Sequence, residues 1–200
     1  DETCAYVAKQ IQRAVGNQPY FLVGYSLGGR IALYYALYSQ QEKYNLQGLI
    51  IEGGNLGLCD EEEKKVRWKN DVFWAQRFSR ETAKSVLNDW YQQAVFAHLT
   101  EGQRRALIEQ RQANCGDNIA QMLLATSLAK QPDLRPYVKN SPYPIYYFCG
   151  ERDHKFKQMA LDNQLNLSVI PNAGHNAHQE NPMAFAAQLN ALLRDKFIAF

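Results

Sequence analysis

The sequence lacks most of the features that mark membrane, secreted or nucleic-acid-binding proteins. No apolar run approaches the roughly 20 residues that a membrane-spanning helix needs, and the first residues, DETC, lack the basic stretch and apolar core of a signal peptide. The 22 Lys and Arg side chains nearly balance the 20 Asp and Glu side chains, so bulk charge does not favour a nucleic acid as partner. The four cysteines include no CxxC pair, which favours reduced thiols over disulfides. We therefore expect a cytoplasmic protein that binds neither membrane nor nucleic acid.

What the sequence does contain is a set of short apolar strands that alternate with helices at both ends of the chain. The predicted strands cover 20–23, 49–51, 145–149 and 167–170. Helices with apolar residues at helical spacing are predicted over 3–15 and 27–39, and Asn181-Pro182 begins a final helix. Because continuous apolar strands separated by helices form parallel sheets covered on both faces, the fold class predicted is α/β.

The middle of the chain, 58–134, contains no convincing strand. Acidic residues at 60–62 begin one helix, and the TEGQ string at 100–103 has the pattern of a capping box that begins another. Several helices inserted between two strands form a lid. The expected organisation is one domain, with a first core segment over 1–57, a helical lid over 58–134 and a second core segment over 135–200.

The GYSLG string at 24–28 matches G-x-S-x-G and lies between a predicted strand and a predicted helix. In a nucleophile elbow, the glycines permit a tight strained turn and close packing of the helix on the sheet. The turn would expose the hydroxyl of Ser26, and the amide of Leu27 could donate to a developing oxyanion. A G-x-S-x-G match alone is also compatible with a purely structural turn.

The residues that follow two later strands favour the catalytic interpretation. Asp153 comes directly after the strand that ends at 149, and His175 follows the strand that ends at 170. Both are placed at the carboxyl ends of strands, where parallel sheets gather their active sites. The chain order Ser26, Asp153, His175 is the order of the α/β-hydrolase fold. Taken singly, Asp153 could be a helix cap and His175 a structural histidine.

The remaining histidines carry weaker signals. His175 and His178 are spaced as HxxH, but no convincing third ligand accompanies them, so no metal site is predicted. His98 and His154 are expected at the surface.

Arginine is the second informative residue type. Arg30 lies one helical turn after Ser26, so it can share the face that looks into the site. Arg67, Arg77 and Arg111 come from the predicted lid. Each could equally be a solvated or salt-bridged side chain. A guanidinium can bind a carboxylate through two hydrogen bonds. Arginines from both the helix after Ser26 and the predicted lid therefore favour a small, multiply anionic substrate.

Longer strings extend the pattern beyond the triad. They are FLVGYSLGGR at 21–30, IEGGNLGL at 51–58, FWAQRF at 73–78, DWYQQAVF at 89–96, LATSLAKQPDLR at 124–135, YYFCGERD at 146–153 and VIPNAGHNAHQENP at 169–182. With these strings, the chain resembles the 2-succinyl-6-hydroxy-2,4-cyclohexadiene-1-carboxylate synthases of menaquinone biosynthesis, the MenH family. The resemblance includes the lid strings, which are more specific than the triad.

The resemblance implies a lyase of α/β-hydrolase fold that eliminates pyruvate from an enolpyruvyl cyclohexene substrate, with no metal or organic cofactor. His175, oriented by Asp153, would make the Ser26 oxygen basic enough to remove a proton beside the succinyl ketone, and the Leu27 amide would hold the oxyanion. It also implies a set of substrate-binding residues, namely Tyr25, Arg30, Arg67, Trp90 and Arg111. The role of Arg77 is left open.

The chain departs from this family before the elbow strand. The resemblance implies roughly 60 further residues there, with an early strand and a His-Gly turn that supplies a second oxyanion donor. Only residues 1–19 precede the strand here, and no His-Gly occurs. We therefore expect the N-terminal strands to be absent from this chain, which leaves one edge of the 20–23 strand open to association.

Two other functions remain open at this point. A carboxylesterase or thioesterase would use the same triad with Ser26 as a true nucleophile. A chain that lacks part of the fold could also be an inactive fragment.

Overall fold

The computed structural model describes residues 2–197, with side chains described as far as residue 194, and the chain divides into two compact units. The first, which we call the core unit, comprises Asp1–Leu56 and Leu134–Phe200. The second, which we call the helical unit, comprises Gly57–Asp133. Each unit is described by itself.

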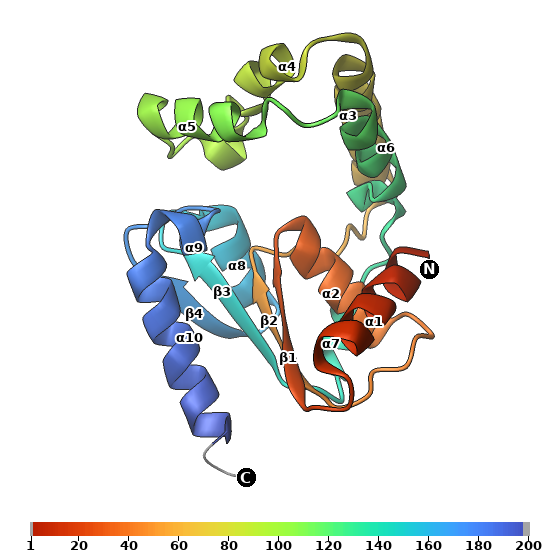
Figure 1. Ribbon diagram of the computed structural model, residues 1–200, viewed down its shortest axis with the longest axis vertical. Helices are drawn as coiled ribbons and strands as arrows, with labels where there is room; N and C mark the ends of the chain where they lie inside the picture. The colour runs from red at the N-terminus through yellow and green to blue at the C-terminus, as the bar shows by residue number, and fades with distance from the viewer. Residues whose placement is uncertain (1, 198–200) are drawn as a thin grey trace. The chain divides into compact units, whose positions relative to one another are not determined.

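The core unit contains four strands and six helices among its described residues (Figure 1). Its strands are β1 (Tyr20–Tyr25), β2 (Leu46–Glu52), β3 (Ile145–Gly150) and β4 (Asn166–Ile170). Its helices are α1 (Glu2–Val15), α2 (Leu27–Leu37), α7 (Arg135–Lys139), α8 (His154–Asp162), α9 (Ala177–Glu180) and α10 (Pro182–Phe197). The sequence therefore predicted every strand, although β2 begins three residues earlier and extends one residue further than its apolar run over 49–51.

The four strands form one parallel sheet in the order β1-β2-β3-β4. The register places Tyr25 opposite Glu52 and Glu52 opposite Phe148, so the strands end at a common edge. A parallel sheet whose strands alternate with helices confirms the predicted α/β class. The carboxyl ends of β1, β3 and β4 lead into the segments that carry the predicted catalytic residues.

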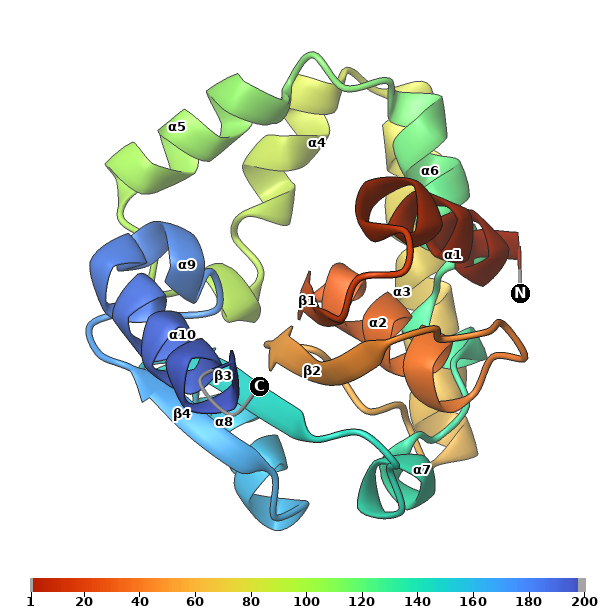
Figure 2. The ribbon, with the colours of Figure 1, turned by 60° about the horizontal axis from the view of Figure 1, so that its bottom comes forward.

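Helices cover both faces of the sheet (Figure 2). Ile50 and Phe148 belong to a buried cluster against which the apolar side chains of α10 pack. Ile51 points to the other face, where its Cγ2 atom lies 3.1 Å from the position that a Cβ atom would take on Gly29 of α2. Since neighbouring residues of a strand face opposite sides, α2 and α10 bury alternate side chains of β2. Burial of one large aliphatic or aromatic side chain stabilises the fold by about 1.5–3 kcal/mol.

Strand β1 lies at the edge of the sheet, and no other strand of the described residues pairs with its outer side. Its Val23 side chain is 49% exposed. Unpaired amides and carbonyls on an apolar edge can act as a template for another strand. Association through this edge stays a prediction.

We expect the substitution Val23→Lys to reduce self-association of the chain, because a charged side chain on an edge strand opposes strand addition. The measurement is the concentration dependence of the sedimentation coefficient for the chain and the variant. Val66→Lys is the matched control, because Val66 is 67% exposed but lies on a helix. Equal self-association of the two variants would contradict this role for the edge.

The helical unit contains only helices among its described residues. They are α3 (Glu61–Arg80), α4 (Ala83–Trp90), η1 (Ala94–Phe96), α5 (Glu101–Arg111), α6 (Gly116–Ala125) and η2 (Leu128–Lys130). Asp60 caps α3 by accepting hydrogen bonds from the amides of Glu62 and Glu63. Thr100 and Gln103 form the predicted capping box at the start of α5. The predicted helix starts at 60–62 and 100–103 are thus confirmed.

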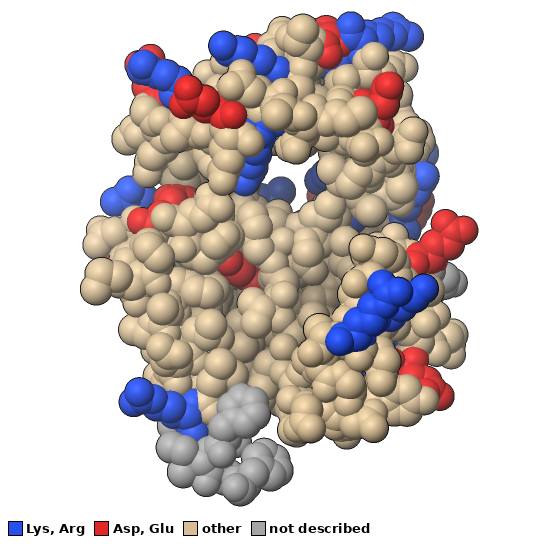
Figure 3. Space-filling model, in the orientation of Figure 1, with Lys and Arg blue, Asp and Glu red and all other residues tan. Residues whose placement is uncertain are grey.

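Charged side chains are scattered over the face shown in Figure 3 in small blue and red groups, some of which adjoin, with wide tan areas between the groups. This distribution agrees with the near balance of 22 basic and 20 acidic residues in the sequence. None of the described helices is long and apolar enough to cross a membrane.

Candidate active site

The predicted elbow lies between β1 and α2. Ser26 adopts φ 49° and ψ −108°, a positive φ that a side chain other than glycine rarely adopts. Its amide donates a hydrogen bond of 2.7 Å to the carbonyl oxygen of Glu52, which holds the turn against the end of β2. Backbone strain of this kind costs of order 1–3 kcal/mol and persists only where the surrounding structure imposes it. The local geometry is therefore that of a nucleophile elbow and not of a relaxed turn.

The glycines at 24, 28 and 29 differ in how closely the neighbouring backbone approaches them. A Cβ atom on Gly24 would lie 2.5 Å from the carbonyl oxygen of Gly28, so no side chain fits at position 24. A Cβ atom on Gly28, by contrast, would meet nothing within 4 Å. The close approach of α2 to the sheet is made by Gly29, whose Cβ position lies 2.9 Å from the oxygen of Gly24. The expectation that both motif glycines serve packing was wrong for Gly28.

The three predicted catalytic residues converge in the core unit. The Nε2 atom of His175 lies 3.0 Å from Oγ of Ser26, and its Nδ1 atom lies 2.7 Å from Oδ2 of Asp153. Asp153 and His175 are both buried, with 6% and 5% of their surface exposed. A proton on Nδ1 is donated to Asp153, which leaves Nε2 as the acceptor for the Ser26 hydroxyl. The predicted convergence is confirmed.

Asp153 also performs the structural role that the sequence left open. Its Oδ1 atom accepts a hydrogen bond of 3.4 Å from the amide of Phe156, which caps α8. The cap and the imidazole use different carboxylate oxygens, so both interactions exist together. The cap fixes the carboxylate at the end of β3.

Two neighbours hold the ring of His175 in place. The ring of Phe156 stacks on it with centroids 4.8 Å apart and an angle of 28° between the planes. On another side lies Gly53, which has φ +56° and a Cβ position only 2.8 Å from Cε1 of His175. A side chain at position 53 would therefore occupy the space of the imidazole. Gly53 follows β2 directly, so the end of this strand shapes the site as well.

Sequence reasoning missed Glu52, the last residue of β2. This carboxylate is only 2% exposed, and it accepts hydrogen bonds from the backbone amide of His178 at 3.0 Å and from its Nδ1 atom at 2.7 Å. A carboxylate at the carboxyl end of a predicted strand was the available signal, since the same rule found Asp153. His178 thus has a carboxylate partner. Among the described residues, no three His, Cys, Asp or Glu side chains lie where they could hold a metal ion.

The structure places Tyr25, Leu27 and Arg30 around Ser26 in the core unit. Tyr25 is the last residue of β1, and its ring centroid lies 5.4 Å from that of His175. Leu27 is the first residue of α2, where amides have no partner within the helix. Arg30 lies one turn further along α2, and its amide donates to the carbonyl oxygen of Ser26 at 3.0 Å. His154 is exposed at the start of α8, as expected.

In the helical unit, Arg67 is held by a buried carboxylate. Its Nε atom lies 2.8 and 3.0 Å from the two carboxylate oxygens of Asp71, and Oγ of Ser127 donates to Asp71 at 2.6 Å. Asp71 is 2% exposed. The carboxylate thus orients one edge of the guanidinium, which has two further nitrogens able to donate to a ligand.

Arg111 and Trp90 are also anchored within the helical unit. The guanidinium of Arg111 donates to the hydroxyl of Tyr91 and lies over the Tyr91 ring, 5.8 Å from its centroid. Trp90 packs edge-on against Trp74, with ring centroids 5.1 Å apart. His98 is half-buried in this unit.

Arg77, whose role was left open, forms ion pairs within the helical unit. Its Nε and Nη2 atoms donate to Glu81 at 2.6 and 2.8 Å, and its Nη1 atom lies 2.7 Å from Asp89. The hydrogen bonds to Glu81 and Asp89 raise the pKa of this guanidinium above its usual value. These pairs give Arg77 a structural role in the contact between α3 and α4.

Comparison with known proteins decides the family. A model of the alpha/beta hydrolase fold matches residues 1–182. The chain is 52% identical to the 2-succinyl-6-hydroxy-2,4-cyclohexadiene-1-carboxylate synthase of Yersinia pseudotuberculosis, over 92% of this chain and 67% of that protein. It is 48% identical to the synthase of Serratia proteamaculans, over 96% of this chain and 74% of that protein. A Haemophilus influenzae protein named as a candidate synthase of the same kind is 57% identical, over 97% of this chain and 79% of that protein. The chain belongs to this synthase family.

Solved structures agree with this assignment. MenH from S. aureus superposes with a TM-score of 0.88 at 25% identity, over 98% of this chain and 75% of that one. An esterase from Thermogutta terrifontis superposes with a TM-score of 0.76, but its 20% identity supports the fold alone. The α/β-hydrolase fold inferred from the chain order of the triad is therefore confirmed.

The cysteines of this synthase-family chain are all free thiols. Cys149 precedes the segment that carries Asp153, and burial, followed by the nearby Asp153 carboxylate, raises its pKa to about 12. The thiol is therefore neutral at physiological pH and cannot act as a thiolate nucleophile.

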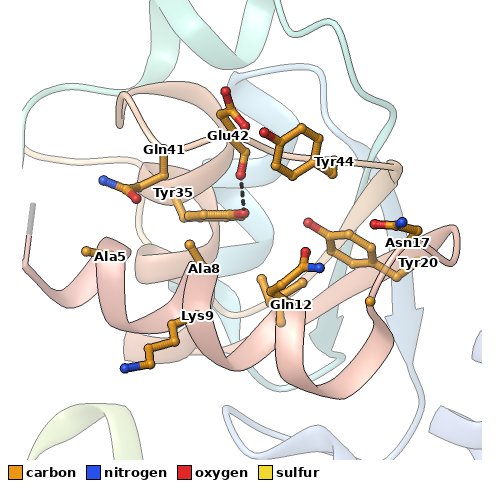
Figure 4. Close-up of a pocket in the computed structure, with 12 residues that line it drawn as sticks. Ala5, Ala8, Lys9, Gln12, Asn17, Tyr20, Tyr35, Gln41, Glu42 and Tyr44 are labelled. Atoms are coloured by element: carbon orange, nitrogen blue, oxygen red, sulfur yellow. Dashed lines mark hydrogen bonds between the residues drawn. The ribbon is translucent and has the colours of Figure 1, made fainter.

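The core unit also contains a cavity of about 460 Å³ near the start of β1 (Figure 4). It is bordered by α1, by Tyr20 at the start of β1 and by Tyr35 of α2, whose hydroxyl donates to the carbonyl oxygen of Glu42 at 2.9 Å. Because Ser26 follows the other end of β1, this cavity is separate from the candidate active site.

Proposed function

We propose that this chain eliminates pyruvate from 2-succinyl-5-enolpyruvyl-6-hydroxy-3-cyclohexene-1-carboxylate and forms 2-succinyl-6-hydroxy-2,4-cyclohexadiene-1-carboxylate, a step of menaquinone biosynthesis. The observation that carries this proposal is the hydrogen-bonded chain Ser26–His175–Asp153 in a member of the synthase family. The reaction class is that of a carbon–oxygen lyase.

The first step is removal of a proton from the carbon beside the succinyl ketone. The Ser26 oxygen takes this proton as its own hydroxyl proton passes to Nε2 of His175, 3.0 Å away. Asp153 stabilises the imidazolium that forms, through the 2.7 Å hydrogen bond to Nδ1. The electron pair of the broken C–H bond moves onto the ketone and leaves an oxyanion.

The second step breaks the carbon–oxygen bond to the enolpyruvyl group. The dienolate returns its electrons to the ring, the bond breaks, and enolpyruvate leaves and takes up a proton to become pyruvate. We assign the Leu27 amide, at the N-terminus of α2, as one donor to the oxyanion. No acyl-enzyme forms, because Ser26 acts as a base and makes no bond to carbon.

The carboxylates of the substrate require cationic partners. We assign Arg30 of the core unit to this role because it lies on α2 one turn from Ser26. The roles of Arg67, Arg111 and Trp90 in substrate binding, and of Tyr25 in lining the pocket, stay predictions from the family resemblance. The fixed orientation of Arg67 by Asp71 supports its role, because a preoriented guanidinium loses less freedom when it binds a carboxylate.

Arginine variants test the binding of the substrate carboxylates. We expect Arg30→Ala and Arg67→Ala each to lower kcat/KM by about 10- to 150-fold. This corresponds to a loss of about 1.5–3 kcal/mol of transition-state stabilisation, the range for hydrogen bonds to charged groups. Arg77→Ala is the matched control and should stay within about twofold, because Arg77 is held by Glu81 and Asp89. Unchanged kinetics for Arg30→Ala and Arg67→Ala would argue for an esterase that handles neutral substrates.

The test of the function itself is direct. The chain is supplied with the enolpyruvyl cyclohexene substrate, and pyruvate is followed by a coupled lactate dehydrogenase assay. Stoichiometric pyruvate without an acyl-enzyme burst supports the proposal. A burst of alcohol or thiol release from ester or thioester substrates, with no pyruvate, would identify an esterase or thioesterase instead. A folded chain that turns over neither class of substrate would be an inactive fragment.

The cytoplasm is the compartment that we propose for this protein, with a small multiply anionic molecule as its substrate. The four free thiols support the compartment, because disulfides form mainly in oxidising environments. Association with another strand through the edge of β1 is a further proposal, which the Val23 variant tests.

A further inference from the structure

A second acid–imidazole pair lies beside the triad and has no part in the proton transfer. Glu52 is buried at the end of β2, and its two carboxylate oxygens accept from the backbone amide and the Nδ1 atom of His178. The side chain of His178 is 33% exposed. A buried carboxylate is costly unless it is hydrogen-bonded, so the two bonds bind His178 firmly to β2.

The ring of His178 rests on Tyr25. The two ring centroids are 4.9 Å apart and the planes meet at 70°, an edge-to-face contact. The ring of Tyr25 also contacts that of His175, with centroids 5.4 Å apart. Tyr25 therefore contacts both the catalytic imidazole and the imidazole that Glu52 holds.

Glu52 also contacts the elbow directly. Its carbonyl oxygen accepts the amide hydrogen of Ser26 at 2.7 Å. The backbone carbonyl of Glu52 thus binds the nucleophile turn, and its carboxylate binds α9 through His178.

The loop that carries His175 is tied to α9 as well. Glu180, at the end of α9, accepts hydrogen bonds from the amides of Gly174 at 2.8 Å and Asn176 at 3.1 Å, which flank His175. Movement of α9 would therefore move the catalytic imidazole. Since Glu52 fixes α9 to the sheet through His178, the position of His175 relative to Ser26 depends on Glu52.

We propose that Glu52 is a positioning residue for the elimination, which acts through His178 to hold Tyr25 and α9 and so sets the distance between His175 and Ser26. This inference rests on the proposed function for its kinetic consequences. Glu52 contacts no reacting atom, so its removal changes the turnover number more than the binding of substrate.

The experiment compares Glu52→Gln and His178→Gln with the unaltered chain. His178→Gln retains a side-chain amide that can donate to Glu52 but removes the ring that rests on Tyr25, so it separates positioning from stability. Glu101→Gln is the matched control, because Glu101 is an exposed residue of α5. The readouts are kcat and KM for pyruvate release, the thermal unfolding midpoint, and the ring-nitrogen NMR shifts of ¹⁵N-labelled His175.

We expect Glu52→Gln and His178→Gln to lower kcat by about 10- to 100-fold, the effect of a misplacement on the order of 1 Å. KM should change less than about threefold, and the His175 nitrogen shifts should move in both variants but not in Glu101→Gln. His178→Gln with unaltered kcat and unaltered His175 shifts would overturn the proposal, even if Glu52→Gln fails to fold. A lower unfolding midpoint with unaltered kcat and shifts would show a merely structural role and would overturn it as well.

The NMR readout separates this inference from the proposed function. If the unaltered chain releases no pyruvate while the His175 shifts still respond to both variants, the proposed function fails, and only the part of this inference that concerns the position of His175 stands. If pyruvate is released normally and neither variant alters the shifts or kcat, the positioning role fails alone.

Discussion

Replacement of Ser26 by alanine is expected to lower kcat for pyruvate release by about 10²–10⁴-fold, the range for loss of a positioned general base. The reason is that the oxygen 3.0 Å from Nε2 of His175 is the atom that removes the proton in the proposed mechanism. KM should change little, because in the proposed mechanism the substrate carboxylates are bound by arginines and not by Ser26. The measurement is steady-state kinetics of pyruvate release, with circular dichroism as a check of folding.

Ser168→Ala provides the control for this substitution. Ser168 is half-buried in β4, and it contributes nothing to the hydrogen-bonded chain of the triad. It should retain full turnover. If Ser26→Ala retained kcat within about threefold of the unaltered chain, Ser26 could not be the base, and the proton would have to be removed directly by His175 or by a water molecule.

Gly53→Ala is expected to lower kcat by about 10²-fold or more, although Gly53 takes no part in the chemistry. A Cβ atom at position 53 would lie 2.8 Å from Cε1 and 3.0 Å from Nδ1 of His175, so the imidazole or the loop must shift. The positive φ of Gly53, +56°, adds a conformational cost of about 1–2 kcal/mol for any residue with a side chain. We therefore expect a lower unfolding midpoint together with the loss of turnover.

Kinetics and thermal unfolding of the same variant separate these two effects. Gly102→Ala is the matched control, because a Cβ atom there would meet nothing within 4 Å and the residue lies in α5. It should leave turnover unchanged and stability equal or slightly higher. A Gly53→Ala protein with normal turnover would show that His175 tolerates displacement, and it would weaken the geometric basis of the mechanism.

Much of the site followed from the sequence because the relevant signals are local or ordered along the chain. The positions of Ser26, Asp153 and His175 after three apolar strands were enough to place them at one edge of a parallel sheet, since parallel strands end together. Helix starts were also readable. Thr100 and Gln103 form the predicted capping box of α5 across only three positions, so the pattern that predicts the box contains both partners.

Other features of the site could not be predicted from the sequence, because the residues that interact lie far apart along the chain. Glu52 and His178 are separated by 126 positions, and their contact depends on the register of β2 and the placement of α9. The need for glycine at 53 arises from the ring of His175, which no pattern around residue 53 reveals. Likewise, the spacing of the GYSLG string could not show that Gly29, and not Gly28, lies against the sheet.

The sequence by itself determined the α/β class, the strand-and-helix order and the catalytic triad, because these depend on periodicity, residue type and chain order. The synthase family was indicated by resemblance over longer strings, and comparison with known proteins confirmed it. Only the tertiary structure decided which side chains hold those residues in place: Asp153 as both cap and partner of His175, Arg77 in ion pairs with Glu81 and Asp89, and Glu52 beneath His178. Such contacts depend on distances of a few ångströms between distant segments, and only the packing of the folded chain sets those distances.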